Sequence, residues 1–257
     1  MTSSCRHDTG EKEGGGNMSY ETIIVEREDN IATITLNRPH AMNAITRKML
    51  REIQEAINAI RNDSNVRVVV FKAAGDRAFS AGTDIKEMAQ TPGDNGILLH
   101  ETLKGIRNLL KPVVCAVNGY CLGAGLDLML SCDLVVASET ARFSMPEINV
   151  GVVSNVEAIL LSRAMSIFRA KEMCLTGDYF DAQKAERCGL VNDVVPVARL
   201  DARVKELAAK LAGKDATALA VQKDVINKWL TTDLETAMDY SILAHSLCHG
   251  AQWDKKG

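Results

Sequence analysis

Apolar positions follow two spacings along the chain, and each spacing predicts a different element. Short apolar runs bounded by polar residues are typical of buried strands, whereas apolar residues three or four apart predict amphipathic helices. The predicted strands lie at 23–25, 31–36, 68–71, 113–117 and 134–137, and the helices between them at 46–61 and 97–110. Residues 75–84 contain two glycines and are expected to form a loop. Strands that alternate with helices in this way favour an α/β core with parallel strands.

The pattern becomes helical after about residue 157. Helices are predicted at 157–165, 166–175, 181–188, 200–211, 217–230 and 234–247, with one extended run at 191–195. We therefore divide the chain into a polar tail (1–18), an α/β core (19–198) and a C-terminal helical region (199–257). The tail ends in three glycines and is expected to be disordered. The helical region is expected to contact a neighbouring subunit, or alternatively to cover the protein's own core.

Composition excludes several partner classes. The net charge is −3 and only 4% of residues are aromatic, so we predict no nucleic-acid partner. No apolar run approaches the roughly 20 residues that span a bilayer, so no membrane partner is predicted.

The seven cysteines form no CxxC pair, which indicates reduced thiols in a cytoplasmic protein. The alternative of a catalytic Cys121 has no histidine nearby in sequence. His245 and His249 are four apart but have no further ligands, so no metal is predicted.

The segment 116–137 holds the main candidate chemistry. An apolar run ends there in a turn, and glycines at 119, 123 and 125 precede an apolar stretch that contains Asp127. Glycines allow a ligand to approach the backbone, and the first N–H groups of a helix have no partner within it. This arrangement suits the binding of a developing oxyanion. The alternative is a glycine-rich turn that only packs.

Glu147 is a second acid among apolar residues, in the segment 141–153. A carboxylate in such surroundings is desolvated unless it is paired or functional. Asp127 and Glu147 are therefore a candidate acid/base pair. The alternative is that both are ordinary capping or salt-bridged carboxylates.

Five segments together resemble the crotonase superfamily, the enoyl-CoA hydratase/isomerase family. They are LNRPHAMNAI (36–45), AFSAGTDIKEM (78–88), AVNGYCLGAGLDLMLSCDLVVAS (116–138), ARFSMPEINVGVV (141–153) and LTGDYFDAQKAERCGLVNDVV (175–195). Their order and spacing match the family over roughly residues 20–248. The resemblance implies a crotonase-like ββα spiral core with a C-terminal helical region. It also implies a homotrimer or a hexamer of two stacked trimers.

The resemblance assigns a role to each matching position. The amides of Thr83 and Ala124 would bind the thioester oxygen of an acyl-CoA. Glu147 would be the principal proton donor and base, and Asp127 would position water. Coenzyme A, as part of the substrate, would bind along the first glycine loop, with no other cofactor. The residues implied in that binding are Arg38, Ala41, Ala81, Gly82, Asp84, Ile85, Lys86 and Gly123, of which Arg38 and Lys86 are phosphate candidates.

The implied reaction is addition of water to a 2-enoyl-CoA. Three alternatives remain: isomerisation of an acyl-CoA double bond, C–C hydrolysis of a β-diketone, and a binding subunit that has lost catalysis. Two departures from the family bear on this choice. Asp127 stands where many hydratases have glutamate, and Ser154, Asn155, Glu157 and Ala158 replace small residues of a glycine-rich stretch. We expect the Glu157 carboxylate to cap the following helix; the alternative is that it enters the catalytic site.

Overall fold

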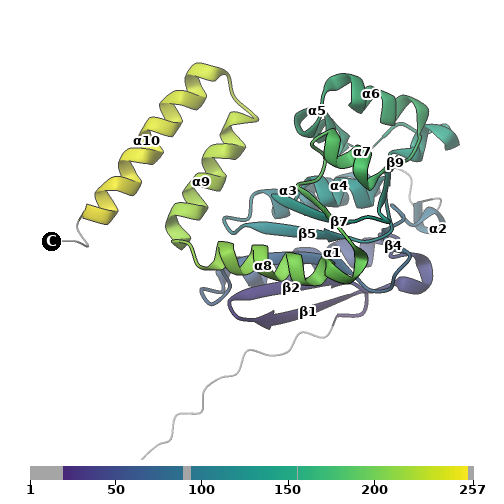
Figure 1. Ribbon diagram of the computed structural model, residues 1–257, viewed down its shortest axis with the longest axis horizontal. Helices are drawn as coiled ribbons and strands as arrows, with labels where there is room; N and C mark the ends of the chain where they lie inside the picture. The colour runs from purple at the N-terminus through teal and green to yellow at the C-terminus, as the bar shows by residue number, and fades with distance from the viewer. Residues whose placement is uncertain (1–19, 89–93, 155, 254–257) are drawn as a thin grey trace, which may run out of the picture.

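The computed structural model describes residues 20–88, 94–154 and 156–253, which form two sheets covered by helices (Figure 1). The larger sheet has six strands in the order β1-β2-β3-β5-β7-β10. Their bounds are β1 Ile23–Glu28, β2 Ile31–Leu36, β3 Val68–Ala73, β5 Val113–Val117, β7 Leu134–Ser138 and β10 Asp193–Val195. All neighbours in this sheet are parallel except β1 and β2. The expectation for residues 1–18 lies outside the described residues.

The antiparallel β1–β2 hairpin departs from the parallel sheet that the sequence predicted. Its turn consists of Asp29 and Asn30, with φ angles of 49° and 64°. Two successive residues with positive φ match the twist of a two-residue hairpin turn, and Asp and Asn tolerate this conformation. The polar segment before the turn extends β1 to Glu28, three residues beyond the predicted strand.

The four central strands of the larger sheet, β2, β3, β5 and β7, are buried on both faces. Val69, Phe71 and Cys115 point into the main core with helices α1 (Arg47–Asn62) and α3 (Asp94–Arg107). Because side chains alternate along a strand, the intervening residues face the opposite side. There Val68, Val70, Val114, Ala116 and Val136 pack against Leu200, Val204 and Ala208 of helix α8 (Leu200–Ala212). Helices thus cover both faces, as an almost continuous apolar strand sequence requires.

A second, four-stranded sheet has the order β4-β6-β8-β9. The strands are β4 Ala78–Ser80, β6 Tyr120–Leu122, β8 Arg142–Ser144 and β9 Phe180–Asp181. The expectation of a loop throughout 75–84 was therefore wrong, because β4 lies within it. Strands of two or three residues are too short to show a periodic pattern. Helix α4 (Ala124–Leu130) begins directly after β6 and packs on this sheet.

The predicted helices are present, with ends shifted by a few residues. One differs in kind: residues 157–165 form the 3-10 helix η3 (Val156–Leu160) followed by α5 (Leu161–Ala164). The remaining short elements are η1 Pro39–Ala41, α2 Ile85–Met88, η2 Pro146–Val150, α6 Ile167–Thr176, α7 Ala182–Arg187 and η4 Val197–Arg199.

The C-terminal helical region divides into two parts. Helix α8 covers the larger sheet, whereas α9 (Ala216–Trp229) and α10 (Leu234–Trp253) project from the rest of the protein as an antiparallel pair (Figure 1). The buried Lys223 ammonium of α9 bonds Asp133 Oδ2 at 2.7 Å. This ion pair holds the base of the projecting pair to the sheet. Among the described helices, none is long and apolar enough to cross a membrane.

Candidate active site

The backbone around Thr83 is fixed by the segment 42–45. The Ile45 amide donates to the Gly82 carbonyl at 2.8 Å, and the Asp84 amide donates to the Ile45 carbonyl at 2.9 Å. These two bonds flank Thr83, which forms a parallel bridge with Ile45. In a parallel bridge of this kind, one residue bonds the two residues that flank its partner, and the N–H of the partner itself points to the other side. The Thr83 amide therefore points away from Ile45.

The amide of Ala124 is the first of helix α4. Gly123 caps this helix with φ of 49° and ψ of −122°, a conformation that glycine tolerates. The first hydrogen bond within the helix runs from the Asp127 amide to the Gly123 carbonyl at 3.0 Å. The Ala124 N–H therefore has no acceptor within α4. A polar group outside the helix can accept from it.

The two glycine segments approach each other so closely that side chains would not fit. A Cβ atom on Gly82 would lie 3.0 Å from the Leu122 carbonyl oxygen and 3.6 Å from the Ala124 nitrogen. A Cβ atom on Gly123 would lie 3.9 Å from Gly82 Cα and 2.5 Å from Glu147 Oε1. The structure thus brings the backbone next to Thr83, the start of α4 and the Glu147 carboxylate to one place.

Glu147 lies at the start of η2, with its carboxylate directed at Gly123. Its Oε2 atom is buried and accepts no hydrogen bond from the residues that the structure describes. Burial raises the pKa of this carboxyl above its ordinary value, and a hydrogen bond from its own backbone amide opposes the shift. A carboxyl group with a raised pKa is suited to general acid–base catalysis near neutral pH.

Asp127 is fully buried in the first turn of α4. It and Glu147 lie near the same thiol, that of Cys174 on α6. Burial raises the pKa of Cys174, a hydrogen bond with Ser154 opposes this, and the charges of Glu147 and Asp127 raise it further. The charges of the two predicted acids therefore both act on this one thiol, although 19 residues separate them in sequence.

A nucleophilic role for Cys121 is disfavoured by its surroundings. Burial raises the pKa of this thiol well above 9.0, and the nearby Cys132 and Asp127 raise it further. A thiol that remains protonated is a poor nucleophile. The six described cysteines are all free, two of them buried and four half-buried.

The positions predicted to bind coenzyme A lie on η1 and on the segment from Ala81 to α2. Arg38, a phosphate candidate, is already paired: its guanidinium bonds Asp84 Oδ2 at 3.1 Å and the Ala44 carbonyl at 2.6 Å. This ion pair joins the two segments and partly neutralises Arg38 as a phosphate ligand. Ile85 and Lys86 are exposed on α2, so Lys86 is the better placed cation.

Asn43 has a positioning role that the sequence did not reveal. It is buried, with φ of 52°. Its amide nitrogen donates to the carbonyls of Ala74 and Ala78, both at 2.9 Å, and its oxygen accepts from the Arg38 amide at 2.9 Å. Asn43 therefore joins η1 to β4 beneath the first glycine loop. In the sequence, only its place in the segment 36–45 marked Asn43 as a candidate. Asparagine occurs at positive φ in many unrelated turns, so this conformation alone does not indicate a role.

The Glu157 carboxylate does not cap the following helix, and that expectation was wrong. It accepts hydrogen bonds from Arg107 Nη1 at 2.6 Å and lies 2.6 Å from His100 Nδ1, both on α3. Its side chain is 5% exposed. A buried carboxylate is more strongly stabilised by a guanidinium and a second hydrogen-bonding side chain than by the end of a short helix.

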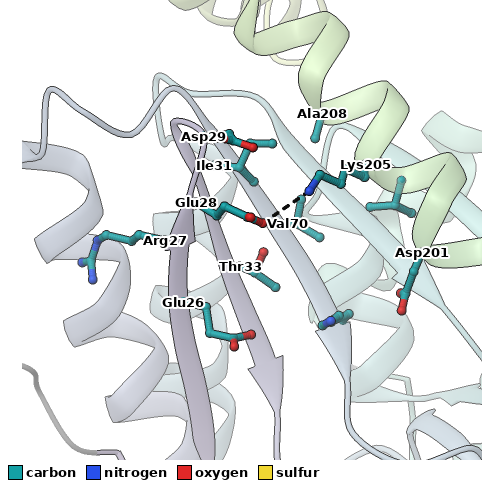
Figure 2. A pocket seen from close by; sticks show the side chains of 12 residues that line it. Glu26, Arg27, Glu28, Asp29, Ile31, Thr33, Val70, Asp201, Lys205 and Ala208 are labelled. Carbon is teal, nitrogen blue, oxygen red and sulfur yellow. Dashed lines mark hydrogen bonds and ion pairs between the residues drawn. The ribbon is translucent and has the colours of Figure 1, made fainter.

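A separate groove of about 520 Å³ lies between β1–β3 and α8 (Figure 2). Its charges are mixed: Lys205 of α8 reaches Glu28 of β1 at 3.4 Å, with Glu26, Arg27 and Asp201 nearby. None of the residues that line it is a predicted site residue. Among the described residues, no group of three or more His, Cys, Asp or Glu side chains is placed to hold a metal ion.

Fold and site together define an α/β protein with a backbone-lined, carboxylate-containing site, and comparisons with known proteins agree. The family profile described as enoyl-CoA hydratase/isomerase matches residues 26–253. The chain belongs to the enoyl-CoA hydratase/isomerase family. Its fold is the one that the resemblance to the crotonase superfamily implied.

Individual relatives match over most of their length. The chain is 35% identical over 245 residues to the crotonyl-CoA hydratase of Syntrophomonas wolfei, covering 93% of this chain and 94% of that protein. It is also 35% identical to the short-chain-enoyl-CoA hydratase of Clostridium acetobutylicum, with 93% of each covered. The crystal structure of an enoyl-CoA hydratase from Bacillus anthracis superposes with a TM-score of 0.86 at 31% identity, covering 92% of this chain and 96% of that one.

Proposed function

We propose that this chain adds water across the double bond of a 2-enoyl-CoA thioester. The observation that carries the proposal is the position of Glu147, whose carboxylate lies against Gly123 where the two glycine segments meet. An acid and two backbone amides at one place are what an enolate-forming addition requires. The named relatives, a crotonyl-CoA hydratase and a short-chain-enoyl-CoA hydratase, support the same reaction.

The amides of Thr83 and Ala124 form the oxyanion hole in this proposal. They donate to the thioester oxygen as negative charge develops on it. Each such donor contributes about 3–4 kcal/mol to transition-state stabilisation in enzymes where one has been removed. Backbone donors suit this role because the bonds around Gly82 and Gly123 already fix their direction.

Glu147 carries the proton in the proposed mechanism. Its carboxylate accepts a proton from the water as the oxygen bonds to the β-carbon, and the π electrons move to form the enolate. A proton then passes from Glu147 to the α-carbon, so that one water molecule has been added and Glu147 is restored. Asp127, fully buried beside the same thiol, positions the water.

Coenzyme A enters as part of the substrate, and no other cofactor is needed for this chemistry. Its phosphates are expected near Lys86, while Ala41, Ala81, Gly82 and Ile85 provide backbone and apolar contacts. Arg38 and Asp84 then hold the two segments together through their ion pair. The relatives named for crotonyl-CoA and short-chain substrates favour a short acyl group.

The test is incubation with crotonyl-CoA while the absorbance of the conjugated enoyl thioester is followed. We expect the absorbance to fall and 3-hydroxybutyryl-CoA to form. If the thioester binds but no water is added, isomerisation of a 3-enoyl-CoA becomes the better account. If no CoA ester binds, the proposal fails.

We also propose that the chain assembles as a homotrimer, alone or stacked in pairs. The α9–α10 pair exposes a run of large apolar side chains, which marks interaction surfaces. They are Ile226, Trp229, Leu230, Leu234, Met238, Ile242 and Leu243. Light scattering should give three or six times the chain mass of 27.9 kDa. The free thiols suit a reducing compartment, and we assign the protein to the cytoplasm.

A further inference from the structure

Few side chains of the segment that contains Glu147 are buried. From Pro146 to Leu160, one side chain is buried among those whose exposure the structure describes, and it is Glu157. Four valine and isoleucine side chains between Glu147 and Glu157 point into solvent: Ile148, Val150, Val152 and Val153. Apolar packing therefore contributes little to fixing this segment.

A charged cluster fixes its far end instead. The two oxygens of Glu157 contact different partners, Oε1 with His100 Nδ1 and Oε2 with Arg107 Nη1, each at 2.6 Å. Both partners lie on α3, seven residues apart and so on one face of that helix. A carboxylate bonded through each oxygen is restrained in rotation as well as in position.

The cluster connects the site to other parts of the fold. The 3-10 helix η3, which begins beside Glu157, packs against both α3 and α4. Helix α4 provides Ala124 and Asp127. The Arg107 carbonyl also accepts a hydrogen bond at 3.2 Å from Asn227 of α9. Ala124 and Asp127 are thus on a helix that packs against η3, the element that carries Glu157.

We propose that Glu157 is a positioning residue for the reaction: held by Arg107 and His100, it fixes the segment 147–157 and thereby the distance between Glu147 and the reacting carbons. This inference rests on the proposed hydration. Proton transfer requires heavy atoms within about 3 Å, and a misplacement of 1 Å can reduce the rate about 100-fold. In the proposed function the coenzyme A portion binds along η1 and α2, so we expect its binding to be independent of Glu157.

The test compares Glu157→Gln with Glu101→Gln. Glu157→Gln preserves shape and removes the charge. Glu101 is also on α3 and pairs there with Lys104 at 3.9 Å, but both side chains are about half exposed, so Glu101→Gln is the matched control. We measure kcat for crotonyl-CoA, the Kd for butyryl-CoA, and thermal unfolding, with assays well below the unfolding temperature.

We expect Glu157→Gln to lower kcat at least about 10-fold while the Kd for butyryl-CoA changes less than about 3-fold. Arg107→Gln should lower kcat similarly, and the double variant should be no slower than either single one, because both act through one contact. Glu101→Gln should retain kcat within about 2-fold. Wild-type kcat in a folded Glu157→Gln variant overturns the inference, as does a loss confined to Kd.

A second measurement separates this inference from the proposed function. If the wild-type protein does not hydrate crotonyl-CoA, the proposed function has failed, and amide hydrogen exchange then tests the clamp alone. Glu157→Gln should accelerate exchange of the amides from Ile148 to Val153, whereas Glu101→Gln should not. If neither variant changed the exchange of these amides, the proposal that Glu157 fixes this segment would be refuted, whatever reaction the protein catalyses.

Discussion

The two sides of the site are built in opposite ways. On one side, the glycine segments around Gly82 and Gly123 are so close that a Cβ atom added to Gly82 would lie 3.0 Å from the Leu122 carbonyl oxygen, and α4 behind them is almost entirely buried. On the other side, Glu147 lies on a segment with exposed apolar residues and one buried anchor, Glu157. The difference suggests a division of labour. The oxyanion amides are rigid, because their donors must be aimed before the charge develops. The acid lies on a segment with few buried side chains.

Replacement of Glu147 should have the largest effect, because it removes the group that carries the proton and leaves the backbone on both sides of the site unchanged. We expect Glu147→Gln to lower kcat for crotonyl-CoA about 10²–10⁴-fold. The Kd for butyryl-CoA should change little, since the amides and the coenzyme A contacts remain. Glu139→Gln, at an exposed carboxylate, is the control. Substantial turnover by Glu147→Gln would remove Glu147 from catalysis.

Gly123→Ala tests the rigid wall directly. The new Cβ would lie 2.5 Å from Glu147 Oε1, and the backbone at φ 49° and ψ −122° strains any side chain. Displacement of Glu147 or of the Ala124 amide by about 1 Å should cost on the order of 100-fold in kcat.

Gly105→Ala is the matched control for that substitution. Gly105 lies within α3 with open space around its Cα, so alanine should stabilise the fold by about 0.5–1 kcal/mol and leave activity unchanged. If Gly123→Ala and Gly105→Ala had the same kcat, the glycine segment would tolerate a side chain, and its tight contacts would not be needed for activity.

Hydrogen exchange should distinguish the two walls in the unmodified protein. Amides of α4 from Asp127 to Leu130 should be strongly protected, because their side chains are mostly buried and their bonds lie within a helix. Amides from Val150 to Val153 should exchange much faster, since this stretch is exposed. Similar protection in both would mean that the segment with Glu147 is as rigid as the glycine wall.

The smallest effect is on the pH dependence of stability. Burial raises the folded-state pKa of Glu147 above its ordinary value of 4.5, so the folded protein binds this proton more tightly than the unfolded chain. The resulting contribution to stability is complete below the unfolded pKa and is lost as pH rises through the folded pKa. Glu147→Gln should therefore raise Tm relative to the wild type at neutral pH, and the difference should shrink below pH 4.5. A lower Tm for the variant at neutral pH would contradict the claim that burial destabilises the ionised Glu147 carboxylate.

The sequence predicted elements whose patterns were long enough to read. The helix over 46–61 and the buried strands were predicted to within a few residues. Burial of one face imposes a periodic order of apolar residues, which the sequence shows directly. The second sheet was missed, since its strands have two or three residues. The motifs placed Thr83, Ala124, Asp127 and Glu147 as candidates, and the structure brings their segments together.

Contacts between distant residues could not be predicted from local pattern. Asn43 joins η1 to β4 through bonds to residues 31 and 35 positions away. Glu157 pairs with residues 50 and 57 positions earlier. Its place near the start of a helix suggested a cap, but the tertiary contacts with Arg107 and His100 prevailed, because a buried carboxylate is stabilised by a cationic partner such as Arg107.

The most direct test of the central claim is the vibrational spectrum of a bound thioester carbonyl. Glu147→Gln should bind crotonyl-CoA without consuming it, so isotope-edited infrared spectroscopy can record the C=O stretch in the complex. If the amides of Thr83 and Ala124 both donate to this oxygen, the band should move to a clearly lower frequency than in water. A bound carbonyl with the frequency of free crotonyl-CoA would contradict the oxyanion hole and the mechanism that depends on it.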